Sequence, residues 1–246
     1  MTESVTGPLL EIRALSAGYG SATVIRSLSL TVRARESAVI IGPNGHGKTT
    51  LLRAIAGLVR VTDGEVRFDG EPITGRAPER ITASGVVLVP QGDGLFPEMS
   101  VEDNLLMGAF LSSSWRHRRE SLERVYSLFP QVEERARQPA RTLSGGERRL
   151  VALGRALMRP SKILMIDEPS LGLAPIAIDA VYGAIADLKA HETTLLLVEE
   201  NFTHVRGVAD SFHLLEMGAI VRTGSYEELV KDESIAAAYL GSAVEP

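Results

Sequence analysis

The stretch Gly42-Pro43-Asn44-Gly45-His46-Gly47-Lys48-Thr49 fits the pattern G-x-x-x-x-G-K-[ST] of a phosphate-binding loop. The apolar run 39–41 leads into it, which favours a buried strand. Behind the loop, apolar residues recur at helical spacing: Leu51, Leu52, Ile55 and Leu58. Because the motif requires strand, loop and helix in this order, a chance glycine-rich turn is the weaker interpretation.

The residue types of this loop suit contact with phosphate. Glycines let the backbone come close to phosphate oxygens and adopt conformations that side chains forbid. Amide N–H groups at the helix start point at the anion, aided by the helix dipole. We expect Lys48 to reach the β- and γ-phosphates and the Thr49 hydroxyl to contact Mg²⁺. His46 is expected to point outward, because only its backbone is needed.

Composition limits the classes of protein that fit this chain of 246 residues. Its net charge of −5 lacks the basic footprint of nucleic-acid binding, and the absence of cysteines excludes disulfides and thiolate metal sites. No apolar run approaches the ~20 residues needed to cross a bilayer. Residues 1–8 lack the layout of a secretory signal. We therefore expect a loose leader at 1–8 and a cytoplasmic chain that reaches a membrane only through a partner.

Strand and helix patterns alternate along most of the chain. This alternation predicts a parallel sheet with helices on its faces. Expected strands lie at 9–14, 27–32, 39–41, 86–89, 163–166 and 195–198, with a short one between the turn signals at 63–64 and 69–70 and a hairpin over 212–221. A helix is expected over 178–188. The mostly helical block 95–158, with breaks at Pro130 and Pro139, is expected to form a subdomain of its own.

Two adjacent carboxylates end the apolar run 163–166. Buried charges need a reason, and Asp167 at a strand tip suits Mg²⁺ because hard cations prefer oxygen ligands. Glu168 is then placed to orient or deprotonate a water that attacks the γ-phosphate. The alternative is an Asp-Glu helix cap, although Pro169 fits a loop better.

A second candidate anion site lies at Ser144, Gly145 and Gly146, which precede an apolar helix pattern. A Ser N-cap is the simpler alternative. In the order phosphate-binding loop, Leu143–Glu147, Asp167-Glu168, the motifs resemble the nucleotide-binding subunit of an ABC transporter over nearly the whole chain. The resemblance implies that two ATP molecules are sandwiched in a head-to-tail dimer, with Ser144 and Gly146 acting on the partner's γ-phosphate.

The same resemblance implies the fold, the cofactors and further site residues. It implies an α/β fold: a P-loop NTPase (RecA-like) core with a mostly parallel sheet, an N-terminal antiparallel β subdomain and an inserted α-helical subdomain. One domain then spans 9–246, with core and β subdomain at 9–94 and 159–246. ATP and Mg²⁺ are the implied cofactors. Thr50 would contact the α-phosphate, Gln91 would sense Mg²⁺ and the γ-phosphate region beside the groove where the membrane subunit docks, and Tyr19 would stack on adenine.

Three positions depart from the family pattern, and one of them is His46, where the phosphate loop usually carries a small residue. Glu199 stands where the family carries a switch histidine, and its carboxylate would repel phosphate unless protonated or turned away. Ala174 replaces an aspartate in the loop that meets its counterpart across the dimer. His204 lies too far along to replace the histidine and is interpreted as an ordinary helix residue.

The segments 168–175 and 197–201 resemble the second ATPase subunit of branched-chain amino-acid importers, and 89–92, 95–97, 101–105, 154–158 and 238–241 support this. The resemblance implies permease subunits as partners, a second ABC ATPase (heterodimer or homodimer), an extracytoplasmic binding protein reached indirectly, and a peripheral place on the cytoplasmic face of the inner or plasma membrane. Importers of urea or short-chain amides, a regulatory module with weak turnover, and an ABC ATPase acting on ribosomes or DNA stay open as alternatives. The basic cluster 116–119 is interpreted as a solvated helix face, with anionic lipid as the alternative.

Overall fold

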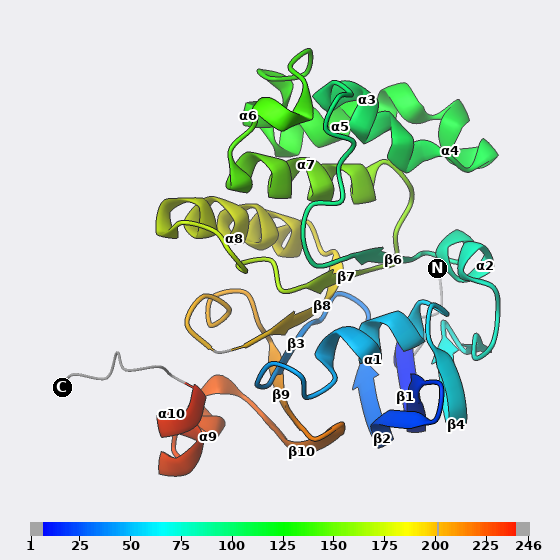
Figure 1. Ribbon diagram of the computed structural model, residues 1–246, viewed down its shortest axis with the longest axis vertical. Coiled ribbons are helices and arrows are strands. Elements are labelled where there is room, and N and C mark those ends of the chain that lie inside the picture. Colours follow the sequence, from blue (N-terminus) through cyan, green and yellow to red (C-terminus); the bar gives the residue numbers. More distant parts are fainter. Residues whose placement is uncertain (1–6, 201, 240–246) are drawn as a thin grey trace, which may run out of the picture.

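The computed structural model describes residues 7–200 and 202–239, whose strands form two sheets (Figure 1). Most of the predicted leader, residues 1–6, lies outside the described residues, as do Asn201 and the last seven residues. Within the described part, no helix is both long and apolar enough to cross a membrane. The predicted division into subdomains at residues 95 and 158 stays a prediction.

The larger sheet has the strand order β10-β9-β3-β8-β7-β6. Its strands β3, β8, β7, β6 and β9 run parallel, and β10 pairs antiparallel with β9. The bounds are β3 Ser37–Ile41, β6 Val86–Val89, β7 Ile163–Asp167, β8 Thr194–Glu199, β9 Ser211–Glu216 and β10 Ala219–Gly224. Every residue of β3, β7 and β8 is buried, as expected of parallel strands covered on both faces. The predicted parallel sheet and C-terminal hairpin are confirmed.

The smaller sheet is antiparallel, in the order β2-β1-β4-β5. Its strands are β1 Leu10–Tyr19, β2 Ala22–Val32, β4 Arg60–Phe68 and β5 Glu71–Pro72. The predictions for β1 and β2 were too short, because register shifts between Ile12 and Ala17 break the alternation that marks a strand. The turn predicted at 63–64 was also wrong. Gly64 lies inside β4, where a Cβ would stand 2.3 Å from the carbonyl oxygen of Ala14.

The two faces of the larger sheet belong to two cores. On β3, Ala38 and Ile40 pack toward the antiparallel sheet and α1 (Lys48–Ile55), while Val39 and Ile41 pack toward the helices of the opposite face. That alternation is the period-2 pleat of a strand. Figure 1 shows α7 (Gly145–Leu157) and α8 (Pro175–Ala190) over one face and α1 with β1, β2 and β4 on the other. The molecule is therefore a layered α/β fold, and the predicted fold class is confirmed.

The short helix α2 (Pro78–Ala83) precedes β6, and further helices fill the stretch between β6 and β7. They are α3 Val101–Leu106, η1 Met107–Ala109, α4 Ser112–Arg116, α5 Arg118–Leu128, α6 Pro130–Glu133, η2 Ala140–Thr142 and α7, while α9 Tyr226–Leu229 and α10 Glu233–Tyr239 follow the last strand. A helix ends before Pro130 and α6 begins at it, so the predicted break is confirmed.

Two smaller predictions were wrong. Leu58 follows the end of α1 and is 58% exposed, because the helix stops at Ile55 and the chain turns at Gly57, φ 74°. His204 lies in a turn segment between β8 and β9, not in a helix.

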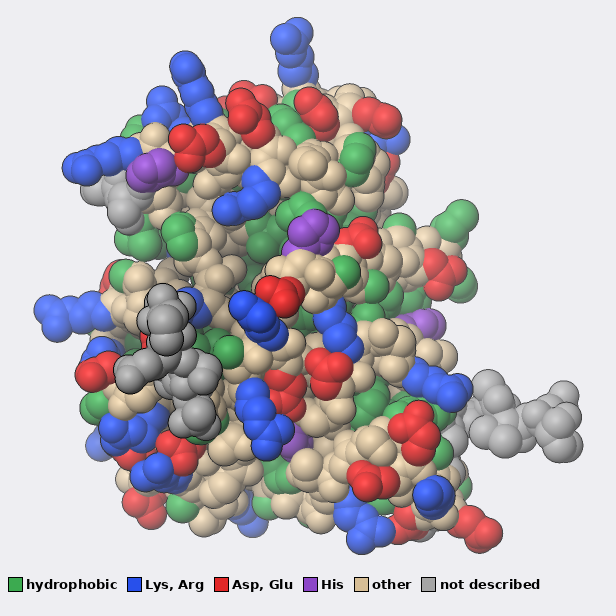
Figure 2. Space-filling model, turned by 180° about the vertical axis from the view of Figure 1, so that it is seen from behind, with side chains coloured by type: hydrophobic (Ala, Val, Ile, Leu, Met, Phe, Trp, Pro, Cys, Tyr) green, Lys and Arg blue, Asp and Glu red, His purple; other side chains and the backbone are tan. Residues whose placement is uncertain are grey.

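On the face seen in Figure 2, basic and acidic side chains are interspersed and do not gather by sign.

Candidate functional site

The phosphate-binding loop joins the end of β3 to the first residue of α1. Gly47 is the N-cap of α1 with φ 109°, and a Cβ there would lie 2.8 Å from the side chain of Ile25. A Cβ on Gly42 would lie 2.4 Å from the carbonyl oxygen of Leu215. Both glycines are thus required by the space that the fold leaves them. The free N–H groups at the start of α1 make the loop suitable for an anion.

Lys48 is buried to 3% exposure, and its ammonium faces the inside of the loop. It donates to the carbonyl oxygens of Gly42 at 2.8 Å and Pro43 at 3.2 Å. It also forms an ion pair of 3.1 Å with Glu168, whose side chain is 8% exposed. The side-chain amide of Gln91 donates to the other oxygen of Glu168 at 2.8 Å. Three predicted site residues from three distant segments therefore meet at one point.

A cleft of ≈ 320 Å³ opens over this point. It is lined by Val24, Asn44, Gly45, Gly47, Lys48, Thr49, Thr50, Gln91 and Glu168. The sequence predicted all of these residues except Val24, whose place in β2 gave no signal. His46 lies beside the cleft, and its ring nitrogen Nδ1 accepts from the backbone N–H of Met217 at 3.4 Å. The ring of His46 is half-buried against the turn between β9 and β10.

Thr49, which lines the cleft, and Asp167, which contacts Thr49, offer oxygen ligands. The Thr49 hydroxyl donates to Asp167 Oδ1 at 3.0 Å, and Asp167 is 2% exposed. Burial raises the pKa of Asp167, whereas the hydrogen bond from Thr49 lowers it. A hydroxyl and a carboxylate side by side beneath a phosphate cradle fit Mg²⁺, which takes few protein ligands and completes its shell with phosphate and water oxygens. Gln91, the third predicted ligand, reaches the same cleft.

Ser144, Gly145 and Gly146 lie apart from this cleft. Ser144 is the N-cap of α7 and forms a capping box: Glu147 N–H donates to Ser144 Oγ at 3.3 Å, and Ser144 N–H donates to Glu147 at 2.7 Å. A Cβ on Gly146 would meet that of Ala177 in α8 at 2.7 Å. The cap that sequence analysis held as the alternative is therefore present. It leaves Ser144 exposed at a helix start, where a further anion could bind.

The sequence family follows from the comparisons with known proteins. A family model described as ABC transporter matches residues 25–171, more than half of the chain. The chain belongs to this family. ATP with Mg²⁺ is the cofactor of this family.

Relatives agree over most of the chain. The high-affinity branched-chain amino acid transport ATP-binding protein BraG of Pseudomonas aeruginosa is 36% identical over 95% of this chain and 100% of its own length. The probable branched-chain amino acid transport ATP-binding protein LivF of Archaeoglobus fulgidus is 32% identical over 89% of this chain and 93% of its own. A crystal structure of a nucleotide-free ATP-binding cassette from an ABC transporter superposes with a TM-score of 0.83 at 26% identity, covering 95% of this chain and 99% of its own.

Two other predicted residues of this ABC protein lie outside the cleft lining. Tyr19 ends β1 and is 48% exposed, so its ring is free to be covered by a planar group. Glu199 ends β8 and is 6% exposed. Its carboxylate accepts hydrogen bonds from the Tyr182 hydroxyl and from the backbone N–H of Ser170 at 3.1 Å. Glu199 is thus turned away from the phosphate loop, one of the two states in which sequence analysis allowed a carboxylate here.

Two buried polar side chains near the site, Tyr182 and Arg149, were not predicted as site residues from the sequence. Tyr182 in α8 holds Glu199, and burial raises the pKa of its hydroxyl. Arg149 in α7 donates to the backbone on both sides of Gln91 and at Glu168. Arg149 adjoins the Ser-Gly-Gly stretch, which was the available signal, but an arginine on a helix is normally a surface residue.

Proposed function

We propose that this chain is the ATP-hydrolysing subunit that powers a membrane importer of branched-chain amino acids. The observation that carries the proposal is the junction of Lys48, Gln91 and Glu168 over the pair Thr49–Asp167. The names of the relatives in Pseudomonas and Archaeoglobus support the substrate class. Intact Lys48, Asp167 and Glu168 speak against a regulatory module with weak turnover.

The chain's own residues have distinct tasks in this proposal. Backbone N–H groups of residues 45–50 and the Lys48 ammonium hold the triphosphate, and Mg²⁺ beside Thr49 and Asp167 would supply charge neutralisation at its oxygens. When the γ-phosphate engages Lys48, Glu168 is left with Gln91 as its donor. Glu168 then accepts a proton from the attacking water, a task suited to a carboxylate whose other oxygen is held by the Gln91 amide.

A second ATPase subunit, related or identical, completes each site in this proposal. Ser144 and Gly145 lie at the exposed start of α7, outside the phosphate cleft of their own chain. Nearby Leu171 and Ile176 are 48% and 82% exposed. Apolar side chains beside an anion-binding helix start suit a face that another subunit covers.

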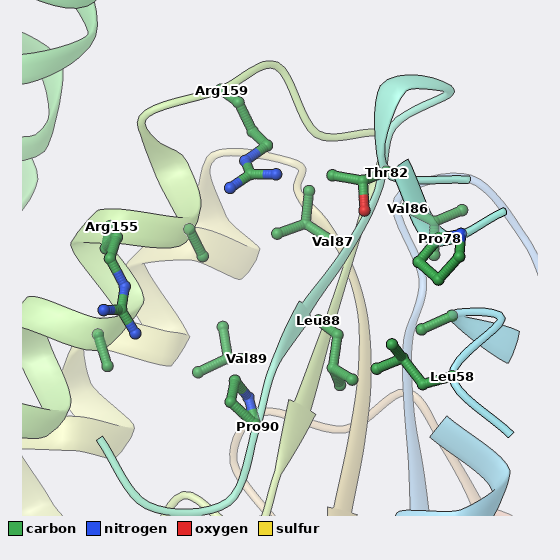
Figure 3. A pocket seen from close by; sticks show the side chains of 13 residues that line it. Leu58, Pro78, Thr82, Val86, Val87, Leu88, Val89, Pro90, Arg155 and Arg159 are labelled. Atoms are coloured by element: carbon green, nitrogen blue, oxygen red, sulfur yellow. The ribbon is translucent and has the colours of Figure 1, made fainter. Parts of the chain in front are cut away.

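Permease subunits would dock in a groove along β6. The groove, ≈ 250 Å³, has Val86–Val89 in its middle, Leu58 and Pro78 on one side and Arg155 and Arg159 on the other (Figure 3). It continues directly into Gln91, so a segment seated there lies next to the catalytic cleft. Through the permease the chain would sit on the cytoplasmic face of the membrane and respond indirectly to an extracytoplasmic binding protein.

Reconstitution of the chain with its permease subunits in vesicles tests the proposal. We expect ATP hydrolysis and ATP-driven uptake of leucine, isoleucine and valine into vesicles. Glu168→Gln should lower hydrolysis by about 10²–10⁴-fold while leaving nucleotide binding intact. Absence of hydrolysis by the wild-type assembly would refute the ATPase role. Hydrolysis stimulated by urea or amides, with no leucine uptake, would refute only the substrate class.

A further inference from the structure

Arg149 is a buried cation whose hydrogen bonds, within residues 7–200 and 202–239, go to backbone oxygen atoms. It lies in the second turn of α7 and is 3% exposed. Its Nη1 donates to the carbonyl oxygens of Pro90, at 3.3 Å, and of Gly92, and its Nη2 donates to that of Glu168 at 3.2 Å. Among the described residues no carboxylate forms an ion pair with it. One side chain therefore joins a helix to two loops that lie far away in sequence.

The burial of this guanidinium is costly and calls for a compensating role. Burial lowers the pKa of Arg149, and Asp93 acts in the opposite direction. Charged donors to carbonyl oxygens form strong hydrogen bonds, and the planar fork of arginine can serve several acceptors at once. A lysine or glutamine at this position could reach fewer of them.

The backbone that Arg149 holds at Glu168 is strained. Glu168 has φ 44°, in the left-handed region that a residue with a side chain rarely adopts. Such a conformation is strained and persists only when its surroundings fix it. The carbonyl oxygen of Glu168 is bound by Arg149 and by Leu171 N–H at 3.2 Å, and its own N–H donates to Val198 at 3.0 Å. With this backbone fixed, the side chain of Glu168 is directed at Lys48 and Gln91.

The same guanidinium fixes Gln91 from both sides, since Pro90 and Gly92 are its two neighbours in the chain. Gln91 in turn donates to the side chain of Glu168. Arg149 thus holds the backbone of both partners of the hydrogen bond that orients the carboxylate.

We propose that Arg149 is a positioning residue that fixes the geometry of Glu168 and Gln91 from the helix that begins at Ser144. Because α7 is the element that would touch the partner's nucleotide, its position is transmitted through Arg149 to the carboxylate of its own site. The inference rests on the proposed ATP hydrolysis. It adds a hydrogen-bonded connection from α7, through Arg149, to the backbone of the residue that would activate the water.

Arg149→Lys in the reconstituted assembly tests this link. The ammonium keeps the charge but cannot span three carbonyl oxygens. We expect kcat to fall by about 10–100-fold, because small misplacements of a catalytic group have effects of that size. Binding of a fluorescent ATP analogue should change by less than about 3-fold, since the phosphate loop is untouched. Amide hydrogen exchange should rise in segments 90–94 and 168–171.

Arg148→Lys is the matched control. Arg148 is the adjacent residue on α7 and ties Asp93 to the helix at 2.7 Å, but it donates to none of the three carbonyl oxygens that Arg149 binds. The kcat and the amide hydrogen exchange of the Arg148→Lys assembly should stay near those of the wild type. Equal losses in both variants would mean that loosening the 90–94 loop is enough, which would overturn the proposal.

A double-mutant cycle separates positioning from general packing. If Arg149 acts through Glu168, then Arg149→Lys in a Glu168→Gln background causes no further loss of residual hydrolysis. Multiplicative losses would contradict the proposal. Arg149→Gln, which removes the buried charge, serves as the second variant and should show the same fall in kcat. Unfolding of both variants, or unchanged kcat in a wild-type assembly that does hydrolyse ATP, would overturn the inference while leaving the proposed function intact.

Discussion

Glu199 shows at the residue scale how a departure from a family pattern finds a structural use. The sequence resemblance predicts a switch histidine at this position, whereas the carboxylate of Glu199 accepts hydrogen bonds from the Tyr182 hydroxyl and the backbone N–H of Ser170. The contact with Ser170 fixes the turn that follows Glu168. The carboxylate contributes to the site by holding backbone, at a distance from the phosphate.

Replacement of Glu199 should therefore affect stability more than nucleotide binding. Glu199→Leu leaves a buried hydroxyl and a buried N–H without an acceptor, which should cost about 2–3 kcal/mol in the free energy of unfolding. Glu199→Gln keeps an acceptor oxygen and should cost less. Denaturant unfolding measures both. Exposed Glu200 is the control, because Glu200→Leu should stay within about 0.5 kcal/mol. A stable Glu199→Gln protein with altered affinity for ATP would instead indicate direct contact with phosphate.

Sequence reasoning succeeded for single residues wherever the chemistry lies in contiguous backbone. Lys48, Thr49 and their glycines lie in the predicted order of strand, loop and helix, because a phosphate loop is built from consecutive amides. The direction of Glu199 was left open, because it depends on Tyr182, a residue of another element.

At the element scale, the N-terminus of α7 carries both a helix cap and the proposed contact with the partner's nucleotide. Its capping box, Ser144 with Glu147, recurs in α9 with Ser225 and Glu228. Both caps satisfy helix N–H groups in the same way. Of these two caps, only that of α7 is followed by two glycines. Substitutions at Ser144 and Ser225 can therefore separate the loss of a helix cap from the loss of the proposed site for the partner's phosphate.

Ser144→Arg should leave ATP binding by the isolated chain nearly intact and lower hydrolysis by the assembly by about 10²–10³-fold, the cost of losing a stabilising donor in a catalytic site. Ser225→Arg removes the matched cap, costs about 1 kcal/mol of stability, and should leave hydrolysis unchanged. ATPase assays of both assemblies give the comparison. If hydrolysis survives Ser144→Arg, the trans-site prediction is wrong.

Element boundaries were predicted well where a strand is covered on both faces and poorly where it bulges. The buried strands β3, β7 and β8 are uninterrupted apolar runs. In β1, Ala14 adopts φ 47° and the alternation fails, so the second half of the strand was missed. Tertiary pairing with β2 and β4 maintains the strand despite this break.

At the scale of the whole molecule, the groove along β6 brings together parts that are remote in sequence. Leu58 comes from the turn after α1, Pro78 from α2, and Arg155 and Arg159 from α7 and the turn after it. Leu58 was expected on the buried face of a helix and is instead an exposed apolar wall of this groove (Figure 3).

A charge in the groove should weaken assembly with the permease and leave the cassette itself unchanged. Leu58→Asp should weaken binding to the permease by about 10-fold or more, the effect of losing an apolar contact at the centre of an interface. Val221→Asp is the control, because Val221 is similarly exposed at 52% but lies on β10. Co-purification and binding titrations measure the difference. Equal binding by both variants would exclude the groove as the docking surface.

The sequence by itself determined the phosphate loop, the carboxylate pair at the end of β7, the parallel character of the sheet and the family, because each of these is encoded in short contiguous segments. Only the tertiary structure decided the direction of the Glu199 side chain and the place of Leu58 in the groove along β6. It also decided that Arg149 binds the backbone at Glu168 and on both sides of Gln91. These features depend on contacts between segments tens of residues apart. Local propensity and periodicity describe the segments, whereas packing fixes how their side chains meet.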